Sequence, residues 1–248
     1  MVVVKIMHKM IVLIPCYNEE KNIDKVIENI INYTSSNNSL NYRFTIDYLI
    51  INDCSKDTTL DICNNKGYNY LNLPVNLGIG GAVQAGYLYA FERGYDIAIQ
   101  HDGDGQHDPC YFEDVISPIV SREADVVIGS RFLDKKGFQS TGLRRFGISF
   151  LSKLIYLCSG AKIHDVTSGY RAVNRKYIKI FAAHYAQDYP EPEAIMDAVL
   201  NKAKIMEIPV VMCEREEGKS SINSLKALYY MIKVSLSIIL HRIVMTKK

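Results

Sequence analysis

Short apolar runs alternate with amphipathic segments along the first half of the chain. The runs at residues 10–15, 46–52, 96–100 and 124–129 are rich in Val and Ile, which is typical of buried strands. Apolar residues at three- and four-residue spacing follow the first run and predict a helix that contains Ile23 and Ile30. The pattern also predicts a strand at 68–73 and helices over 58–66, 82–93 and 109–120. Strands that alternate with helices indicate an α/β fold with a mostly parallel sheet and helices on both faces.

The second half of the chain is less regular. A basic loop and helix at 135–157 precede a polar turn at 167–171 and an acidic, Pro-containing segment at 189–193. A strand-like run at 205–212 then leads into a charged loop at 214–221. Because no repeat and no long linker divides the sequence, we expect one domain over residues 1–221.

The last segment, residues 222–244, is two-sided at helical spacing. Its polar stripe comprises Lys226, Tyr230, Lys233, Ser237 and His241, and its apolar stripe comprises Leu225, Leu228, Ile232, Leu236, Ile239 and Ile243. In a membrane-spanning helix, Lys233 would lie in the middle of the bilayer, where a charge is costly. We therefore expect an amphipathic helix over 222–248 that lies on a membrane surface or packs on the domain or on a partner.

Composition narrows the class of protein. The 248 residues are 48% hydrophobic and 23% charged, which excludes intrinsic disorder and low complexity. The net charge of +2 is too small for a general nucleic-acid binder, so no nucleic-acid partner is expected. Positive charge is concentrated from Lys202 onward, where nine Lys and Arg residues face four Asp and Glu residues, and this excess favours an anionic membrane leaflet.

The cysteines and the beginning of the chain bear on the compartment. Six cysteines stand singly, with no C-x-x-C pair, so neither a zinc site nor a compact disulfide framework is indicated and a reducing compartment is expected. Lys5, His8 and Lys9 interrupt the apolar stretch at the beginning of the sequence. We interpret the stretch at residues 1–15 as a buried first strand rather than as a signal peptide.

Polar clusters follow four of the predicted elements, at residues 16–20, 52–57, 76–81 and 101–108. In α/β sheets of this kind, ligands bind at the carboxyl ends of the strands, so these clusters are expected to meet at one site. In the third cluster, glycines around Gly80 can bring bare backbone close to a ligand at a helix start, where N–H groups favour anionic oxygens. A plain turn into a helix is the alternative.

The strongest local signal is Asp102-Gly-Asp104-Gly-Gln106, directly after the strand at 96–100. Two carboxylates one residue apart at a strand end can hold a hard divalent cation and leave positions open for a phosphate-bearing substrate. The alternative is a solvated turn that only caps the helix beginning at Pro109.

With these residues assembled, the chain resembles the inverting, metal-dependent glycosyltransferases of the A-type fold, and especially their polyprenyl-phosphate branch, which includes dolichyl-phosphate-mannose synthase. The resemblance covers about residues 10–221 and implies a single Rossmann-like A-type domain. The motifs that carry it are Ile14-Pro-Cys-Tyr-Asn-Glu19-Glu20, Ile51-Asn-Asp53-Cys-Ser55-Lys-Asp57, Asn76-Leu-Gly-Ile-Gly80, Asp102-Gly-Asp104-Gly-Gln106, Gly129-Ser-Arg131-Phe, Thr167-Ser-Gly-Tyr-Arg171 and Arg215-Glu-Glu-Gly218-Lys219-Ser220.

The resemblance implies where a UDP- or GDP-sugar donor and its metal bind. The residues that it assigns to donor binding are Pro15, Tyr17, Glu19, Asp53, Gly80, Asp102, Arg215 and Lys219. Arg215 and Lys219 would belong to a loop that closes over the diphosphate and excludes water. Asp102, Asp104 and Gln106 would hold a Mg²⁺ or Mn²⁺ ion that offsets the charge of the departing nucleotide.

The acceptor implied by the resemblance is a polyprenyl phosphate. Arg131, Arg144, Arg145 and Ser149 match positions that grip the lipid phosphate, for which Arg side chains are well suited. A phosphate is largely dianionic at neutral pH and needs little help from a general base. A glycan hydroxyl would need one, and Glu193 sits near where hydroxyl-using relatives place their base.

The leading hypothesis is sugar transfer to a polyprenyl phosphate at the cytoplasmic face of the cell membrane, for cell-surface glycan synthesis. Asp104, Arg131 and Glu193 are the candidate catalytic residues. Transfer to a hydroxyl of a growing glycan, and a non-catalytic nucleotide-sugar-binding scaffold, are the alternatives. Many relatives continue into spanning helices and this sequence does not, so a small membrane-protein partner is also expected.

Overall fold

A mixed β-sheet forms the centre of the protein. The computed structural model describes residues 8–37, 40, 43–134, 136–137, 142–187, 190–213 and 224–245. Within them, seven strands lie in the order β3-β2-β1-β4-β6-β5-β7. The strands are β1 (His8–Cys16), β2 (Phe44–Asn52), β3 (Tyr70–Asn72), β4 (Ile97–Gln100), β5 (Val126–Ser130), β6 (Arg171–Asn174) and β7 (Ile205–Pro209).

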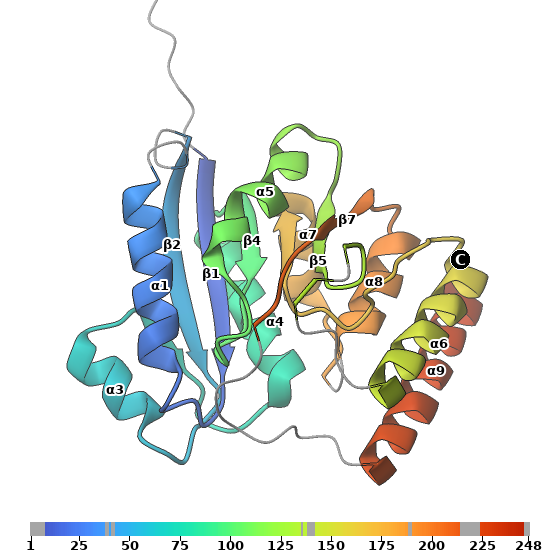
Figure 1. Cartoon of the computed structure of the whole chain (residues 1–248), viewed down its shortest axis with the longest axis horizontal. Helices are drawn as coiled ribbons and strands as arrows, with labels where there is room; N and C mark the ends of the chain where they lie inside the picture. The colour runs from blue at the N-terminus through green and yellow to red at the C-terminus, as the bar shows by residue number, and fades with distance from the viewer. Residues whose placement is uncertain are drawn as a thin grey trace, which may run out of the picture.

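Helices cover both faces of this sheet (Figure 1). The helices are α1 (Ile23–Ser36), α3 (Thr59–Lys66), α4 (Gly78–Glu92), α5 (Phe112–Val120), α6 (Gly142–Ser159), α7 (Arg175–Ala183), α8 (Pro190–Leu200) and α9 (Ser224–Met245), and the short 3₁₀ helix η1 spans Pro109–Tyr111. Side chains of α1, α3 and α5 join the core on one face, and those of α4 and α6 to α9 join the core on the other. The predicted α/β domain with a mostly parallel sheet is confirmed.

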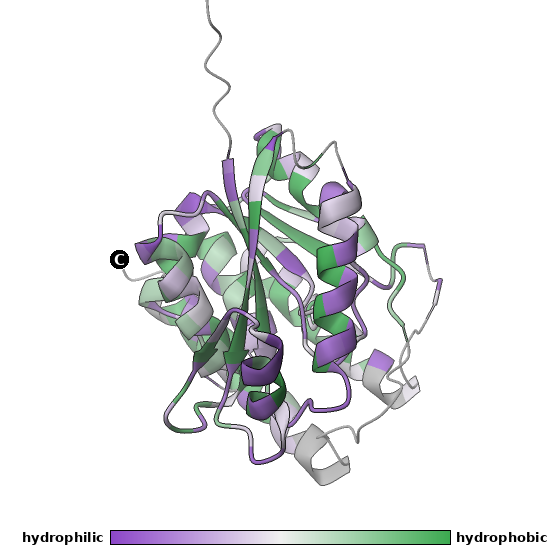
Figure 2. Cartoon of the chain, turned by 90° about the vertical axis from the view of Figure 1, so that its left-hand side faces the viewer, coloured by the Kyte–Doolittle hydropathy of each residue, from purple (hydrophilic) through white to green (hydrophobic). Residues whose placement is uncertain are grey.

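The apolar run of β1 explains why this strand lies inside the sheet. Its neighbours β2 and β4 are both parallel to it, so its two edges are hydrogen-bonded. Successive side chains point to opposite faces: Ile11 packs into the core on the α4 side, whereas Met10 and Val12 pack into the core on the α1 side. Figure 2 shows the same division, with hydrophobic strands inside and hydrophilic residues on the outer helix faces.

One strand was not expected from the sequence. β6 runs antiparallel to both β4 and β5, with Arg171 opposite Gln100 and Ile128. The sequence pattern predicts a polar turn at 167–171, because polar residues stand directly before a strand of only four residues. The turn therefore ends in a strand that carries residues 165–170 to the edge of the site.

The carboxyl-terminal helix α9 lies beside α6 at one end of the protein (Figure 1). Val234 and Ile238 are buried against the domain, whereas Ile232, Leu236 and Ile239 are exposed. The helix therefore packs on the domain and still presents Ile232, Leu236 and Ile239 of its apolar stripe to solvent. Among the described residues, no helix is both long enough and apolar enough to cross a membrane. The division of the chain at residues 221 and 222 stays a prediction.

Candidate functional site

An open cleft of about 960 Å³ lies at the carboxyl ends of β1, β2 and β4. The cleft brings together six of the predicted site residues: Pro15, Tyr17, Glu19, Asp53, Asp102 and Asp104. They come from three loops that are separated in the sequence by up to about ninety positions. The parallel pairing of the strands places those loops side by side, as expected for ligand sites in α/β sheets.

The backbone after β4 continues along β1 and carries the two aspartates to the cleft. The N–H of His101 donates to the carbonyl of Leu13 at 2.9 Å, and the N–H of Gly103 donates to the carbonyl of Pro15 at 3.3 Å. A Cβ at Gly103 would lie 3.1 Å from the Cβ of Cys16. Glycine between the aspartates therefore lets this segment run close to β1.

Asp102 is held from several sides. Its Oδ1 accepts a hydrogen bond from Nε2 of Gln100 at 3.3 Å, and its backbone N–H donates to Nδ1 of His107 at 3.0 Å. A Cβ at Gly169 would lie 2.6 Å from Oδ2 of Asp102, so the carboxylate occupies space that only glycine leaves open. This role of Gly169 was not predicted from the sequence. The sequence shows a glycine in the motif Thr167-Ser-Gly-Tyr-Arg171, but it does not show that this glycine lies against Asp102.

Asp104 and Gln106 shape the next turn. Oδ1 of Asp104 accepts the backbone N–H of Gln106 at 3.0 Å. Gln106 also pairs with Cys213, because its Nε2 donates to the carbonyl of Cys213 at 3.3 Å and its own carbonyl accepts the N–H of Cys213 at 2.9 Å. These contacts tie the Asp104 turn to the segment that enters residues 214–220. The predicted lid residues Arg215 and Lys219 lie outside the described residues.

Two buried histidines, His101 and His107, pack next to this turn. The ring of His107 stacks on Tyr170 with a centroid distance of 4.7 Å, and His101 packs edge-on against His107. Burial lowers the pKa of His107 to about 4, and burial together with the neighbouring His107 lowers the pKa of His101 to about 3. Both rings are therefore neutral near pH 7. Nδ1 of His107 is a hydrogen-bond acceptor, which places its proton on Nε2.

The loops after β1 and β2 are joined by reciprocal hydrogen bonds. The N–H of Asn18 donates to Oγ of Ser55 at 2.9 Å, and the N–H of Glu20 donates to Oδ2 of Asp57 at 3.1 Å. Asn18 has a φ of 58° and Cys54 a φ of 57°, which is a left-handed backbone that residues other than glycine rarely adopt. The hydrogen bonds hold this strained pair of turns in place around the cleft.

Asp53 connects the end of β2 to the beginning of α4. Its Oδ1 accepts the N–H of Leu77 at 2.7 Å, and its backbone carbonyl accepts from Nδ2 of Asn76 at 3.0 Å. Burial raises the pKa of the carboxyl, and the backbone N–H donors oppose that rise. Asp53 thus holds the turn that leads into α4, and it also lines the cleft.

Gly80 lies beneath the cleft rather than on its surface. Gly78, Ile79 and Ala82 line the cleft, whereas Gly80 is buried and its N–H donates to the carbonyl of Gln187 at 3.1 Å. A Cβ there would lie 1.9 Å from the carbonyl oxygen of Ala186. The structure therefore gives Gly80 a packing role, with its amide directed to protein and not to a donor.

The predicted acceptor residue Arg131 is buried and paired. Its Nε and Nη2 donate to the two carboxylate oxygens of Asp165 at 2.7 and 2.6 Å, and Nη2 also donates to Thr167 at 3.0 Å. Burial acts to lower the pKa of Arg131, but Asp165 outweighs it and the pKa is raised. Arg131 is thus a fixed positive charge at the end of β5.

The remaining predicted residues lie away from the cleft lining. Arg145 and Ser149 are exposed, one turn apart on α6. Glu193 is half-buried in the first turn of α8 and is not among the described residues that line the cleft. The Arg144 side chain lies outside the described part of the chain.

Comparison with known proteins gives one family match over most of the chain. The sequence profile of glycosyl transferase family 2 matches residues 11–181. A UDP-N-acetylglucosamine–dolichyl-phosphate N-acetylglucosaminyltransferase of Methanococcus voltae is 31% identical over 80% of this chain and 83% of its own length. A dolichyl-phosphate beta-glucosyltransferase of Trichomonas vaginalis is 32% identical over 93% of this chain and 73% of its own length.

More distant matches agree with this family and with the observed fold. A polyprenol monophosphomannose synthase of Mycolicibacterium smegmatis is 26% identical over 91% of this chain and 85% of its own length. Among solved structures, glucosyl-3-phosphoglycerate synthase of Mycobacterium tuberculosis in complex with Mn²⁺, UDP and phosphoglyceric acid superposes with a TM-score of 0.69. That match has 18% identity and covers 95% of this chain and 78% of the other, so it shows a shared fold.

Proposed function

The chain belongs to glycosyl transferase family 2, and from this premise we propose that this glycosyltransferase moves a sugar from a nucleotide diphosphate to a polyprenyl phosphate, with inversion at the anomeric carbon. The observation that carries the proposal is the pair Asp102 and Asp104 at the cleft that also contains Tyr17, Glu19 and Asp53. The matched relatives are named for transfer to dolichyl or polyprenol phosphates, which supports this acceptor class.

The donor base and ribose are proposed to lie between the loops after β1 and β2. Tyr17 is exposed at the cleft and offers a ring face, and Glu19 and Asp53 offer carboxylate oxygens for base N–H groups and sugar hydroxyls. The hydrogen bonds between the loops at 18–20 and 55–58 fix these groups before the donor arrives. Such preorganisation reduces the entropy lost on binding.

The residues at the bottom of the cleft fit a hard divalent cation. Asp102 and Asp104 both line the cleft, and the space at Gly169 leaves room for the Asp102 carboxylate. Carboxylate oxygens are the ligands that Mg²⁺ and Mn²⁺ prefer. A bound Mg²⁺ or Mn²⁺ would offset negative charge on the diphosphate leaving group. The neutral state of His101 and His107 leaves the carboxylate charge available to such an ion.

The acceptor is proposed to approach from α6. Arg145 and Ser149 are exposed on this helix beside Phe146 and Phe150, whose side chains are also exposed. A phosphate group bound by Arg145 and Arg131 would leave its lipid chain against the two phenylalanines. A phosphate oxygen then attacks the anomeric carbon, and the bond from that carbon to the nucleotide diphosphate breaks on the opposite side. The dianionic phosphate needs no proton removed in this step.

Membrane contact is proposed for the helix pair α6 and α9. Their exposed apolar side chains include Phe146, Leu157, Ile232, Leu236 and Ile243. An exposed apolar surface of this kind marks a protein or membrane contact. We place the enzyme at the cytoplasmic face of the cell membrane, where a polyprenyl phosphate and a nucleotide sugar meet. The small membrane-protein partner expected from the sequence is not supported by the comparisons.

The test is a transfer assay with radiolabelled UDP- and GDP-sugars. Mn²⁺ and either polyprenyl phosphate or a glycan acceptor are supplied, and we expect label in the lipid product. Label only in the glycan would favour the hydroxyl acceptor with Glu193 as base, and donor binding without turnover on any acceptor would favour a non-catalytic scaffold. Asp104→Ala should abolish transfer while the circular dichroism spectrum stays unchanged. Turnover like that of the wild type in this variant would contradict the role of Asp104.

A further inference from the structure

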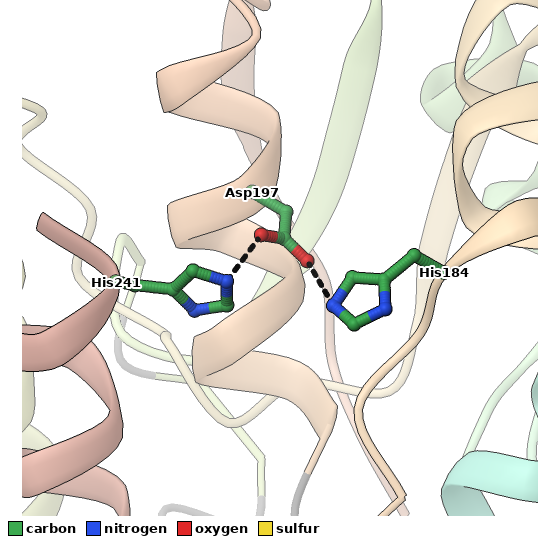
Figure 3. A group of neighbouring side chains, drawn as sticks. All are labelled: His184, Asp197 and His241. Atoms are coloured by element: carbon green, nitrogen blue, oxygen red, sulfur yellow. Dashed lines mark ion pairs between the residues drawn. The ribbon is translucent and has the colours of Figure 1, made fainter. Parts of the chain in front are cut away.

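Three side chains meet where the carboxyl-terminal helix joins the domain. His184 follows α7, Asp197 lies on α8 and His241 lies on α9, and both imidazole rings point toward the carboxylate between them (Figure 3). Nε2 of His241 lies 3.2 Å from Oδ1 of Asp197, and Nε2 of His184 lies 4.0 Å from Oδ2. One ligand atom from each residue lies within 4.8 Å of the other two.

The carboxylate of Asp197 is in an unusual position for an acid. Its side chain is nearly buried, with 11% of its surface exposed, and its two carboxylate oxygens face the imidazoles of His241 and His184. Burial raises the pKa of the carboxyl, and the nearby imidazoles of His241 and His184 act against that rise. A buried carboxylate between two imidazoles is a place where a cation is stabilised.

The structure assigns a zinc site to these three residues: we propose that Nε2 of His184, a carboxylate oxygen of Asp197 and Nε2 of His241 bind one Zn²⁺ ion, with water as fourth ligand. Imidazole nitrogen and carboxylate oxygen are ordinary zinc ligands, and a three-residue set with one open position is a known arrangement. Tetrahedral ligands about 2.0–2.1 Å from zinc lie roughly 3.4 Å apart. The His241 distance already fits, and the exposed ring of His184 has space to close its longer gap.

This site differs in chemistry from the aspartates of the cleft. Asp102 and Asp104 offer oxygen, which suits Mg²⁺ and Mn²⁺, whereas two imidazole nitrogens favour a softer ion such as Zn²⁺. Excess Mg²⁺ should therefore fill the cleft and leave the His184, Asp197 and His241 cluster to zinc. The inference stands independently of the donor and acceptor proposed above.

Zinc at this cluster would fasten α9 to the domain. Helix α9 packs through Val234 and Ile238, and a metal held by His241 would add a coordinate link to α8 and to the segment after α7. That segment continues to Gln187, whose carbonyl accepts the N–H of Gly80 under the donor cleft. The ion would thus connect the proposed membrane-contact helix to the backbone that supports the donor site.

The experiment is zinc titration of metal-free full-length protein in excess Mg²⁺, against a chromophoric chelator. We expect one Zn²⁺ per chain, and a loss of affinity of about tenfold or more in His184→Ala and in His241→Ala. His184→Ala is the informative variant because the side chain is exposed and its removal leaves the fold intact. His8→Ala removes a half-exposed histidine beside Asp96 and should bind zinc as the wild type does.

Two further measurements separate the cluster from the cleft. Zinc should raise the melting temperature of wild type and of Asp104→Asn equally, but not that of His184→Ala. Co²⁺ in place of zinc should give the visible absorption of a four-coordinate nitrogen and oxygen site, which His241→Ala abolishes. Zinc binding that survives both histidine substitutions, or that disappears in Asp104→Asn, would overturn the proposal, and so would a wild type that takes up no zinc.

Discussion

The carboxylate of Asp102 fills the space in front of the bare α-carbon of Gly169, where a Cβ would lie 2.6 Å from Oδ2 and 2.9 Å from Oδ1. Gly169 has no left-handed backbone, so alanine fits its φ and ψ without strain. The three atoms nearest to an added methyl group all belong to the Asp102 side chain. Because this side chain ends in a rotatable carboxylate, the methyl group should displace it rather than unfold the protein.

Gly169→Ala is expected to lower sugar transfer strongly while the free energy of unfolding changes by less than about 1.5 kcal/mol. The reason is that the displaced Asp102 carboxylate no longer meets the donor in the cleft. The measurements are kcat and KM for transfer, and urea denaturation. Gly147→Ala is the matched control, because its methyl group would meet the end of the Met231 side chain, Sδ at 3.2 Å and Cε at 3.8 Å, outside the cleft. Full activity in Gly169→Ala would show that the position of Asp102 does not matter.

Gly80→Ala should destabilise the protein by about 1–3 kcal/mol, the usual range for overpacking. The added Cβ would lie 1.9 Å from the carbonyl oxygen of Ala186 and 2.4 Å from that of Gln187, and backbone cannot rotate away as a side-chain end does. Gly86→Ala on the same helix is the control, since the three atoms nearest to its Cβ are methyl carbons of the Ile51 and Leu13 side chains, at 3.1 Å or more.

Both alanines gain helix propensity, by roughly 0.5–1 kcal/mol relative to glycine, so the difference between the two variants isolates the clash. We expect chemical denaturation to find Gly80→Ala the less stable variant. The opposite order would mean that the segment after α7 moves aside at little cost, and that Gly80 has no packing role.

Removing one charge of the Arg131–Asp165 ion pair should lower the free energy of unfolding much more than removing both charges. Asp165→Asn leaves the buried guanidinium without its carboxylate and should cost about 3–5 kcal/mol in unfolding free energy. The double variant Arg131→Met, Asp165→Leu removes both charges and should recover most of that loss. Unfolding measurements on the wild type, Arg131→Met, Asp165→Leu and the double variant give the coupling energy, and transfer assays on the double variant test separately whether Arg131 serves the acceptor.

The position of the site could be predicted from the sequence because it depends on local patterns. Strand periodicity together with the polar clusters after each strand is sufficient to bring Tyr17, Asp53 and Asp104 to one edge of the sheet. Those patterns depend on residues that are neighbours in the sequence. The parallel order of the strands then places the polar clusters at the same edge of the sheet.

The partners within the site could not be predicted, because they come from distant segments. Gly169 and Asp165 reach Asp102 and Arg131 through β6, a four-residue antiparallel strand whose pairing leaves no periodic signal. The role of Gly80 depends on the segment after α7, about a hundred positions away. The face through which α9 packs could not be predicted either, because Val234 and Ile238 pack on the domain while Ile232 and Leu236 of the predicted apolar stripe stay exposed.

Replacing exposed apolar residues of α9 should weaken membrane binding. Ile232 and Leu236 are 61% and 55% exposed. Transfer of each side chain from water into an apolar phase is favourable by roughly 1.5–3 kcal/mol. Ile232→Ser with Leu236→Ser should therefore reduce binding to anionic vesicles by about tenfold or more. Leu88→Ser, on the exposed side of α4, is the control and should bind as the wild type does. Equal sedimentation of both variants with vesicles would place the membrane contact elsewhere.

The free energy of unfolding should decrease as the pH falls below neutrality, because His101 and His107 are buried. Their folded pKa values, about 3 for His101 and about 4 for His107, lie below the ordinary value near 6.5, so the unfolded chain binds protons that the folded chain does not. This contribution is fully present above pH 6.5 and is lost as the pH falls toward 4, by about 1.4 kcal/mol per pH unit for each histidine.

His101→Phe, which suits the rings of His107, Phe112 and Tyr170, should remove about half of that slope in urea unfolding measured from pH 7 to pH 5. An equal slope in His101→Phe and wild type would mean that the His101 ring takes up its proton without unfolding, and that the turn carrying Asp102 and Asp104 is open to water.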